Sequence, residues 1–470
     1  MNKVDLATIA RWCGARVSGT LSGVSVSGVS TDSREVKRGD LFFALRGARH
    51  DGHAFVSEAF RRGARAAVVE REIKDLPERF RSHPLLRVTS AEKALADIAR
   101  GYRKTLSCLS AAVTGSNGKT TTKNLLGAFL ATTMKTLVSP KSYNNRLGVS
   151  LTILKLDRSH RAAVFELGMN RRGEIRELGR LCRPSAGAIL NVGPAHLGNL
   201  GSLEEIARAK RELLRALEGR RLAALNIDDP FVARFARRFS GETVTFGLSP
   251  GARVRAERIS LSGRGAEFDL VLEGNPRRVR SPLLGLHNVY NLLAAAALAR
   301  RLGVGEKKIL AAIPRLRLPP MRLETKRAGG ARIVNDAYNA NPASMRAALA
   351  VFRSVKAAGK RIMVSGDMNE LGRFARREHL SWGEELAAAG LDRLVFVGPL
   401  SRFAAEGARS EGFPRERIFA CRDAREALVV LEKMVSPGDS ILIKASRIMA
   451  LEEVAQKLAA RRSSSDRKEE

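Results

Sequence analysis

Short apolar runs alternate with amphipathic segments along most of this chain. A short apolar run is typical of a strand buried on both faces, whereas apolar residues at helical spacing are typical of an amphipathic helix. The middle of the sequence predicts strands at 109–113, 162–167, 186–191 and 222–226, and helices at 91–104, 119–130, 173–181, 203–217 and 287–302. The later part predicts strands at 332–335, 361–364, 393–397 and 440–443. Such alternation predicts an α/β fold with parallel, doubly wound sheets.

The chain has 470 residues, which is enough for about three domains. Residues 1–90 predict a small α/β domain, and residues 91–317 predict a central parallel-sheet domain. The stretch Leu318-Pro319-Pro320 predicts a linker, so that residues 318–460 form a C-terminal, Rossmann-like α/β domain. The polar segment 461–470 predicts a disordered tail.

The composition is strongly basic, with 82 lysines and arginines against 48 aspartates and glutamates and a formal net charge of +34. This balance favours anionic partners. The basic residues are spread along the whole chain, and we find no zinc-finger spacing, RNA-binding aromatic motif or long basic block. A basic, nucleotide-dependent nucleic-acid-binding protein is therefore a remote alternative.

The four cysteines, Cys13, Cys108, Cys182 and Cys421, lie far apart in the sequence. This spacing fits a reducing compartment and argues against a disulfide framework or a zinc site. The N-terminus lacks the apolar core of a signal peptide, and no apolar run has the length of a membrane-spanning helix. We expect a soluble, cytoplasmic protein.

A glycine loop is the most informative motif: residues 113–122 read Val-Thr-Gly-Ser-Asn-Gly-Lys-Thr-Thr-Thr. A loop between a strand and a helix N-terminus aims backbone N–H groups at one point, where the helix dipole also favours a phosphate. Lys119 can reach the outer phosphates of a nucleotide, and Thr120 can offer its hydroxyl to Mg²⁺. The loop has the short G-x-x-G-K-T form, because Val113 stands where a full Walker A motif has its first glycine.

Polar residues follow other predicted strands, at the edge where doubly wound sheets bind ligands. Glu166 lies near the end of the strand 162–167, where a carboxylate can hold Mg²⁺. His196 follows the strand 186–191 in a loop with glycine and proline, where it can bind metal or phosphate. Lys210, taken alone, is typical of a solvated helix charge.

Several segments are rich in amides and hydroxyls. The loop Ser142-Tyr143-Asn144-Asn145 either contacts phosphate or substrate or forms turns. The asparagines of His287-Asn288-Val289-Tyr290-Asn291 either cap a helix or recognise a base. Residues 335–342 follow a strand and precede a helix that begins near Pro342. Arg322 follows the linker and can reach across an interdomain cleft.

Together these motifs resemble the Mur ligase family over nearly the whole chain. The ordered set consists of the loop 114–121, Glu166-x-Gly168, Asn191-Val192 with His196, Lys210, Gly285-x-His287-Asn288-x-x-Asn291, and Arg322 with Asp336. The pattern Asp32-Ser33-Arg34 with Gly39-Asp40-Leu41-Phe42 resembles the uridine-binding N-terminal domain shared by the last two ligases of the series.

The segments 336–345 and 366–372 resemble the ligase that adds D-alanyl-D-alanine to UDP-N-acetylmuramoyl-tripeptide. The sibling that adds the third amino acid to the dipeptide usually carries an Asp-Asn-Pro-Arg motif, which we do not find here, and it is the alternative. Folylpolyglutamate synthetase shares the ATP core but lacks the N-terminal domain. The resemblance implies an ATP-dependent peptide ligase of peptidoglycan synthesis that forms an acyl phosphate, and a monomer.

The resemblance also implies ATP and Mg²⁺ as cofactors and a set of site residues. The expected nucleotide contacts are Gly115, Ser116, Asn117, Gly118, Lys119, Thr120, Thr121, Asn288, Arg322 and Asp336. The expected metal site is Thr120, Glu166, His196 and Lys210, and the expected catalytic residues are Lys119, Glu166, His196 and Lys210. The expected substrate contacts are Ser33, Arg34, Ala48, Arg49, His50, Asn144, Asn145, Tyr338, Asn339 and Asn341.

Three points remain open in the sequence. The family's C-terminal Lys-Gly-Ser is Lys444-Ala445-Ser446 here, and alanine adopts a positive φ less freely than glycine, so the loop's conformation is open. Lys210 aligns with a lysine that is carbamylated in many family members, which requires a neutral amine and hence a lowered pKa. The sequence also leaves open whether the third residue of the acceptor peptide is diaminopimelate or lysine.

Overall fold

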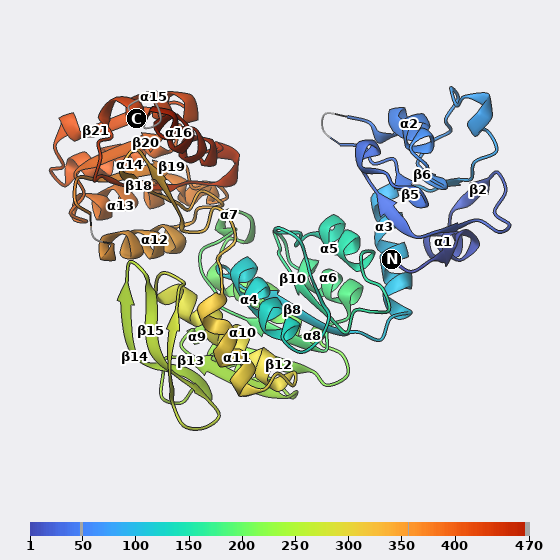
Figure 1. The fold of residues 1–470 in the computed structure, drawn as a ribbon, viewed down its shortest axis with the longest axis horizontal. Coiled ribbons are helices and arrows are strands. Elements are labelled where there is room, and N and C mark those ends of the chain that lie inside the picture. Colours follow the sequence, from blue (N-terminus) through green and yellow to red (C-terminus); the bar gives the residue numbers. More distant parts are fainter. Residues whose placement is uncertain (48–49, 356, 466–470) are drawn as a thin grey trace.

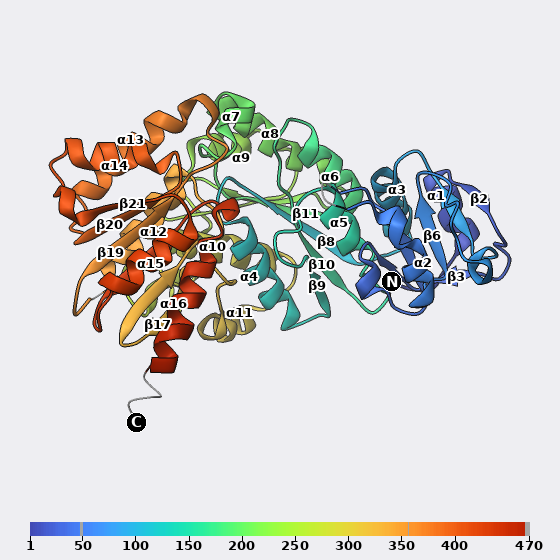
Figure 2. The same cartoon turned by 90° about the horizontal axis from the view of Figure 1, so that it is seen from above.

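The computed structural model describes residues 1–47, 50–355 and 357–465. Figures 1 and 2 show an elongated molecule with the N-terminal part at one end, the C-terminal part at the other and the central part between them. Each part is an α/β unit built on a mainly parallel sheet. The predicted fold class is therefore confirmed.

The N-terminal sheet has the strand order β2-β7-β6-β5-β4, in which β2 is antiparallel to its neighbour and the others are parallel. Its strands are β2 (Arg16–Ser18), β4 (Gly28–Ser30), β5 (Asp40–Phe43), β6 (Ala66–Val69) and β7 (Leu85–Arg87). The short strands β1 (Val4–Asp5) and β3 (Ser25–Val26) pair separately, and the helices are α1 (Leu6–Cys13) and α2 (Val56–Arg61).

Helix α3 (Ala91–Lys104) has the predicted bounds and connects the N-terminal part to the central part. Ser90 caps its first turn. The buried Arg103 donates from Nε to the carbonyl of Cys182 (3.0 Å), from Nη1 to that of Leu106 (2.9 Å) and from Nη2 to that of Cys108 (3.0 Å). One guanidinium thus fixes the end of α3 to the central part, because its fork of donors reaches three separate carbonyls.

The central sheet has the order β16-β15-β14-β13-β12-β11-β8-β10-β9, parallel from β9 to β14 and antiparallel at β15 and β16. Its strands are β8 (Leu109–Thr114), β9 (Thr136–Val138), β10 (Ala162–Glu166), β11 (Ala186–Ile189), β12 (Leu222–Asn226), β13 (Thr243–Gly247), β14 (Val254–Ser262), β15 (Gly265–Leu272) and β16 (Arg277–Ser281). The order reverses at β8, with β10 on one side and β11 on the other, and ligands bind at such a switch point.

Helices cover both faces of the central sheet, and each face has its own apolar core. One core contains residues of α4 (Lys119–Ala131), α10 (Leu286–Arg301) and α11 (Glu306–Ala312). The other contains residues of α3, α5 (Arg146–Ile153), α6 (Glu174–Cys182), α8 (Leu203–Ala216) and α9 (Pro230–Arg238). The short helix α7 (Leu197–Leu200) lies beside the C-terminal part.

The C-terminal sheet has the order β17-β18-β22-β19-β20-β21, with β17 antiparallel and the rest parallel. Its strands are β17 (Glu324–Ala328), β18 (Ala331–Asn335), β19 (Arg361–Gly366), β20 (Arg393–Val397), β21 (Ile418–Cys421) and β22 (Ser440–Lys444). The helices are α12 (Pro342–Ser354), α13 (Ala375–Ala387), α14 (Ser401–Ser410), α15 (Ala424–Met434) and α16 (Glu452–Ser465). Apolar cores again fill both faces.

The end of the chain differs in part from the prediction of a disordered tail over 461–470. Helix α16 continues to Ser465, because the helix that begins at Glu452 meets no proline or glycine before that point. Residues 466–470 lie outside the described residues. No helix of the described chain combines the length and apolar character that crossing a membrane requires.

Replacement of Arg103 tests how strongly its hydrogen bonds fix the end of α3 to the central part. Arg103→Ala leaves three carbonyls without their donor, and we expect the free energy of unfolding to fall by about 3 kcal/mol. Arg100→Ala, on the same helix but exposed and paired with Asp97, should lower it by at most about 0.5 kcal/mol. Urea unfolding measures the free energy of unfolding of both variants. Equal losses in the two would contradict the role of Arg103 in fixing the end of α3.

Candidate active site

A cleft of about 1090 Å³ lies between the central and C-terminal parts and is lined by residues of both. Most of the predicted site residues lie along it: Ser116, Asn117, Gly118, Lys119, Thr120, Thr121, Asn144, Asn145, Glu166, His196, Asn288, Arg322, Asp336, Tyr338, Asn339 and Asn341. Gly115 and Lys210 are not among the lining residues, and Ser33, Arg34 and His50 belong to the N-terminal part. The fold therefore gathers residues from distant sequence segments at one place.

The glycine loop joins the end of β8 to the start of α4, as its sequence predicts. Gly118 has φ +85°, and a Cβ there would lie 2.1 Å from Oδ1 of Asn291, so both the backbone and the neighbouring side chain require glycine. Lys119 Nζ donates to the carbonyls of Gly115 (2.8 Å) and Ser116 (3.2 Å). Burial lowers the pKa of Lys119, and its ammonium lies on the loop where a phosphate would bind.

Thr120, in the first turn of α4, and Glu166, at the end of β10, are both buried and in direct contact. The Thr120 hydroxyl donates to Oε2 of Glu166 (2.7 Å), and Oε1 of Glu166 accepts from Nδ2 of Asn144 (2.8 Å). Arg322, from the C-terminal side of the cleft, donates from Nη2 to the Thr120 hydroxyl (2.8 Å). One hydroxyl thus connects the two sides of the cleft.

The hydroxyl and the carboxylate have the chemistry of a magnesium site. Mg²⁺ prefers oxygen ligands and often takes one or two from the protein and the rest from water and substrate phosphates. No cluster of three or more histidine, cysteine, aspartate or glutamate side chains suited to a metal occurs among the described residues. Thr120 and Glu166 therefore fit a metal that is shared with a nucleotide.

Lys123 is a site residue that the sequence did not reveal. It is fully buried, its Nζ donates to the carbonyls of Ser139 (2.6 Å) and Lys141 (2.5 Å), and it lies 3.8 Å from Oε2 of Glu166. Burial lowers its pKa to about 8. A lysine one turn into a helix is typical of solvent exposure, and only the packing of α4 against the sheet shows otherwise.

His196 and Lys210 occupy different environments. His196 has φ +61°, and its Nδ1 lies 2.8 Å from Oε2 of Glu370, a C-terminal residue that the sequence did not single out as part of the site. Lys210 is buried, and within the described chain no hydrogen bond or ion pair reaches its Nζ. Burial, together with the charge of Lys119, lowers the pKa of Lys210 well below its usual range, which favours a neutral amine.

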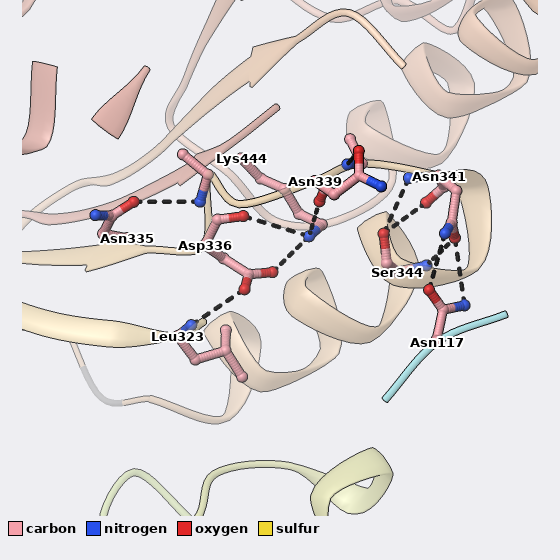
Figure 3. Close-up of polar contacts among 10 residues, drawn as sticks. Asn117, Leu323, Asn335, Asp336, Asn339, Asn341, Ser344 and Lys444 are labelled. Carbon is pink, nitrogen blue, oxygen red and sulfur yellow. Dashed lines mark hydrogen bonds and ion pairs between the residues drawn. The ribbon is translucent and has the colours of Figure 1, made fainter. Parts of the chain in front are cut away.

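Figure 3 shows the polar contacts on the C-terminal side of the cleft. Asp336 pairs with Lys444 (Nζ to Oδ2, 2.5 Å), and its Oδ1 accepts from the backbone N–H of Leu323 (3.1 Å). Asn341 donates from Nδ2 to Oδ1 of Asn117 in the glycine loop (2.8 Å). The amide-rich segment therefore contacts the loop directly.

Several predicted ligand contacts also have structural roles. Asn145 caps α5, and Asn341 caps α12 in a reciprocal arrangement with Ser344. Asn288 donates to the carbonyl of Leu284 (2.8 Å) and accepts from Asn291 (2.9 Å). These bonds set the side-chain orientations that a ligand would meet.

Two further site residues interact with each other. The Arg322 guanidinium stacks over the Tyr338 ring, with Cζ 4.2 Å from the ring centroid, and its Nε has no hydrogen-bond partner in the described chain. The backbone carbonyl of Asn339 accepts from Lys444 (3.0 Å). Arg322 and the amide-rich segment 335–342 therefore lie side by side on the C-terminal side of the cleft.

The proposed uridine contacts lie apart from this cleft. Ser33 is buried, and Arg34 is exposed and pairs with Asp32 (2.6 Å). His50 lies near Phe55, and the predicted contacts Ala48 and Arg49 lie outside the described residues.

Ala445 does not require the freedom of glycine. It has no positive φ, and it is fully buried. A Cβ placed on Gly366 of the neighbouring strand would come within 2.6 Å of the Ala445 methyl, so the methyl occupies space that Gly366 leaves. The loop Lys444-Ala445-Ser446 therefore does not need a positive φ at its central residue, and alanine fits there in place of glycine.

Models of known families match three segments of the chain. They are the Mur ligase family catalytic domain over residues 25–103, the Mur ligase middle domain over 113–299 and the Mur ligase glutamate ligase domain over 321–447. The UDP-N-acetylmuramoyl-tripeptide–D-alanyl-D-alanine ligase of Bacillus subtilis (strain 168) is 36% identical, with 94% of this chain and 96% of that protein covered. The chain belongs to the Mur ligase family.

Solved Mur ligase structures agree with this assignment. A crystal structure of MurF from Acinetobacter baumannii has a TM-score of 0.87 at 32% identity, covering 97% of this chain and 99% of that one. The MurF ligase of Thermotoga maritima, solved in complex with ADP, has a TM-score of 0.78 at 27% identity, covering 93% and 97%. The three-part arrangement is thus that of a Mur ligase.

The Thr120 hydroxyl is testable by paired substitutions. Thr120→Val keeps the shape but removes the hydroxyl shared by Glu166 and Arg322, and we expect kcat for ATP-dependent phosphate release to fall about 100-fold. Thr120→Ser keeps the hydroxyl and should stay within about threefold of the parent. Steady-state kinetics measure both, and a Val variant as active as the Ser variant would exclude a role for the hydroxyl.

Proposed function

We propose that this chain is the Mur ligase that joins D-alanyl-D-alanine to UDP-N-acetylmuramoyl-tripeptide with hydrolysis of ATP. Similarity over 94% of the chain to a ligase of that name carries the proposal. The site agrees with it: a phosphate-binding loop on one side of the cleft and an amide-rich segment on the other, in contact through Asn117 and Asn341.

The reaction needs two successive transfers at one place. The terminal carboxylate of the tripeptide attacks the γ-phosphorus of ATP, the bond to ADP breaks, and an acyl phosphate forms. The unprotonated amine of the dipeptide then attacks the carbonyl carbon, the bond to phosphate breaks, and the nitrogen gives up one proton, which the products balance as hydrogen phosphate. Both transition states carry negative charge, which fixed donors and cations in the cleft stabilise.

The glycine loop is suited to the phosphate end of this chemistry. We assign the ATP phosphates to 115–121 and the charge of the transferring phosphoryl group to Lys119. A bound Mg²⁺ would bring the phosphate oxygens together and neutralise part of their charge. Thr120 and Glu166 would hold it, and His196 with Lys210 would serve a second ion, provided that Lys210 is carbamylated.

The remaining assignments follow the two sides of the cleft. Asn288, Arg322 and Asp336 would contact the nucleotide, and Tyr338, Asn339 and Asn341 would contact the dipeptide. Asn144 and Asn145 would contact the acceptor. Ser33, Arg34 and the 48–50 turn would contact the uridine diphosphate end. We further propose that the protein acts in the cytoplasm as a monomer.

Two substrate pairs separate this function from its nearest alternative. ATP-dependent phosphate release is measured with UDP-N-acetylmuramoyl-tripeptide plus D-alanyl-D-alanine, and separately with UDP-N-acetylmuramoyl-dipeptide plus diaminopimelate or lysine. We expect turnover with the first pair alone. Turnover with the second pair alone would identify the sibling ligase that adds the third amino acid. A folded protein that turns over neither pair but binds nucleic acid would support the alternative of a basic, nucleotide-dependent nucleic-acid-binding protein.

If Lys119 binds the transferring phosphoryl group, its replacement should abolish ATP-dependent turnover. Lys119→Ala removes the ammonium from the loop, and we expect ATP-dependent turnover to fall below detection while the circular dichroism spectrum is unchanged. Lys93→Ala, an exposed lysine of α3, is the matched control and should keep parental turnover. Parental turnover in Lys119→Ala would refute the assignment of the loop.

A further inference from the structure

A second contact between the central and C-terminal parts lies beside the glycine loop. Helix α7 meets the turn that precedes the short 3₁₀ segment Gly372–Phe374. The Gly198 N–H donates to the carbonyl of Glu370 (3.0 Å). A Cβ on Gly198 would lie 2.7 Å from the nitrogen of Gly372 and 2.9 Å from the carbonyl oxygen of Glu370, so the two backbones can approach this closely only with glycine at 198.

The residues that face each other here have unusual backbone conformations. His196 has φ +61° and Glu370 has φ +68°, a region that residues with a side chain enter rarely. Such conformations persist where the surrounding structure holds them, and they cluster at functional sites. In this case they bring Nδ1 of His196 to 2.8 Å from Oε2 of Glu370.

The contact involves one nitrogen of the imidazole ring. His196 Nδ1 and Glu370 Oε2 lie at ion-pair distance but without the alignment of a hydrogen bond. In a neutral histidine the two ring nitrogens have different roles, and a carboxylate this close to one of them favours the tautomer with the proton on that nitrogen. With Nδ1 facing Glu370, Nε2 is the nitrogen that remains for a ligand in the cleft, which His196 lines. The tautomer that leaves Nε2 unprotonated is then favoured by a carboxylate from the other side of the cleft.

We propose that Glu370 is a positioning residue that acts through His196. It sets the imidazole so that Nε2 serves the phosphoryl-transfer site, and it does so from the C-terminal part. The site is therefore complete only when the part that carries the dipeptide segment is docked on the central part. Productive phosphoryl transfer is in this way coupled to the presence of the acceptor side. This inference rests on the proposed ligase function.

Three variants test the proposal against turnover and metal binding. Glu370→Ala removes the carboxylate, Glu370→Gln keeps an acceptor of the same shape, and Gly198→Ala blocks the backbone approach without changing either side chain. Gly305→Ala is the matched glycine control, because a Cβ there meets open space and its φ is −63°. Each variant is assayed for phosphate release as Mg²⁺ is varied, and for Mn²⁺ binding by electron paramagnetic resonance with a non-hydrolysable ATP analogue.

We expect Glu370→Ala to lower kcat and to weaken Mn²⁺ binding about 10-fold or more, with little change in the KM for ATP. Gly198→Ala should likewise lower kcat and weaken Mn²⁺ binding. Glu370→Gln should recover most of the loss, and Gly305→Ala should match the parent. The thermal midpoint of each variant should stay near that of the parent, since the contact is small.

Parental metal dependence and Mn²⁺ binding in Glu370→Ala would overturn the proposal. So would a change confined to the KM for D-alanyl-D-alanine, which would place Glu370 in contact with the dipeptide instead. A parent protein that turns over neither substrate pair would refute the proposed function. In that case Mn²⁺ binding would still decide whether Glu370 acts on His196.

Discussion

The site depends on one constraint: two parallel sheets present the carboxyl ends of their strands to the same cleft. In the central sheet the glycine loop follows β8, Glu166 ends β10 and the His196 loop follows β11. In the C-terminal sheet Asp336 follows β18 and Lys444 ends β22. Because each parallel strand ends at the same edge of its sheet, polar residues from many parts of the sequence meet without long loops. The Thr120 hydroxyl, bonded to Glu166 and to Arg322, is one of the points where the two sides of the cleft are in contact.

The charges in the cleft define geometry more than they stabilise the fold. Lys123 and Lys210 are buried amines whose pKa burial lowers, and the paired Asp336 and Lys444 are largely removed from water. Taking such groups out of water offsets much of their mutual attraction. The free energy of folding comes instead from the apolar cores on both faces of the central and C-terminal sheets. These cores keep the strand ends fixed, so the polar groups need little rearrangement to meet a ligand.

The sequence predicted those features that depend on local pattern. The strand before the glycine loop and the helix after it, the connecting helix α3 and the strands β12 and β20 follow from apolar periodicity and capping residues. Strand β16 was missed, since three arginines in Arg277–Ser281 hide an edge strand whose outer side faces water. Helix α16 was not predicted, and its last residues fall in a segment whose polar composition predicted disorder.

The contacts that the sequence could not reveal join residues far apart in the chain. The burial of Lys123 depends on how α4 packs against the central sheet. The pairing of Asn117 with Asn341 and the approach of Glu370 to His196 depend on how the central and C-terminal parts pack together. The hydrogen bond from Arg103 to the carbonyl of Cys182 is of the same kind. The family resemblance supplied many of the site residues, but it gave no reason for their orientation; the hydrogen bonds and backbone conformations supply that reason.

The central claim is that ATP and Mg²⁺ bind where the two strand edges meet. A crystal structure of the full chain with Mg²⁺ and a non-hydrolysable ATP analogue tests it directly. The account predicts the outer phosphates on the backbone N–H groups of 115–120, a metal ion between Thr120 and Glu166, and the nucleoside beside Asn288, Arg322 and Asp336. A nucleotide bound away from the glycine loop, or a metal ion that contacts neither Thr120 nor Glu166, would contradict it.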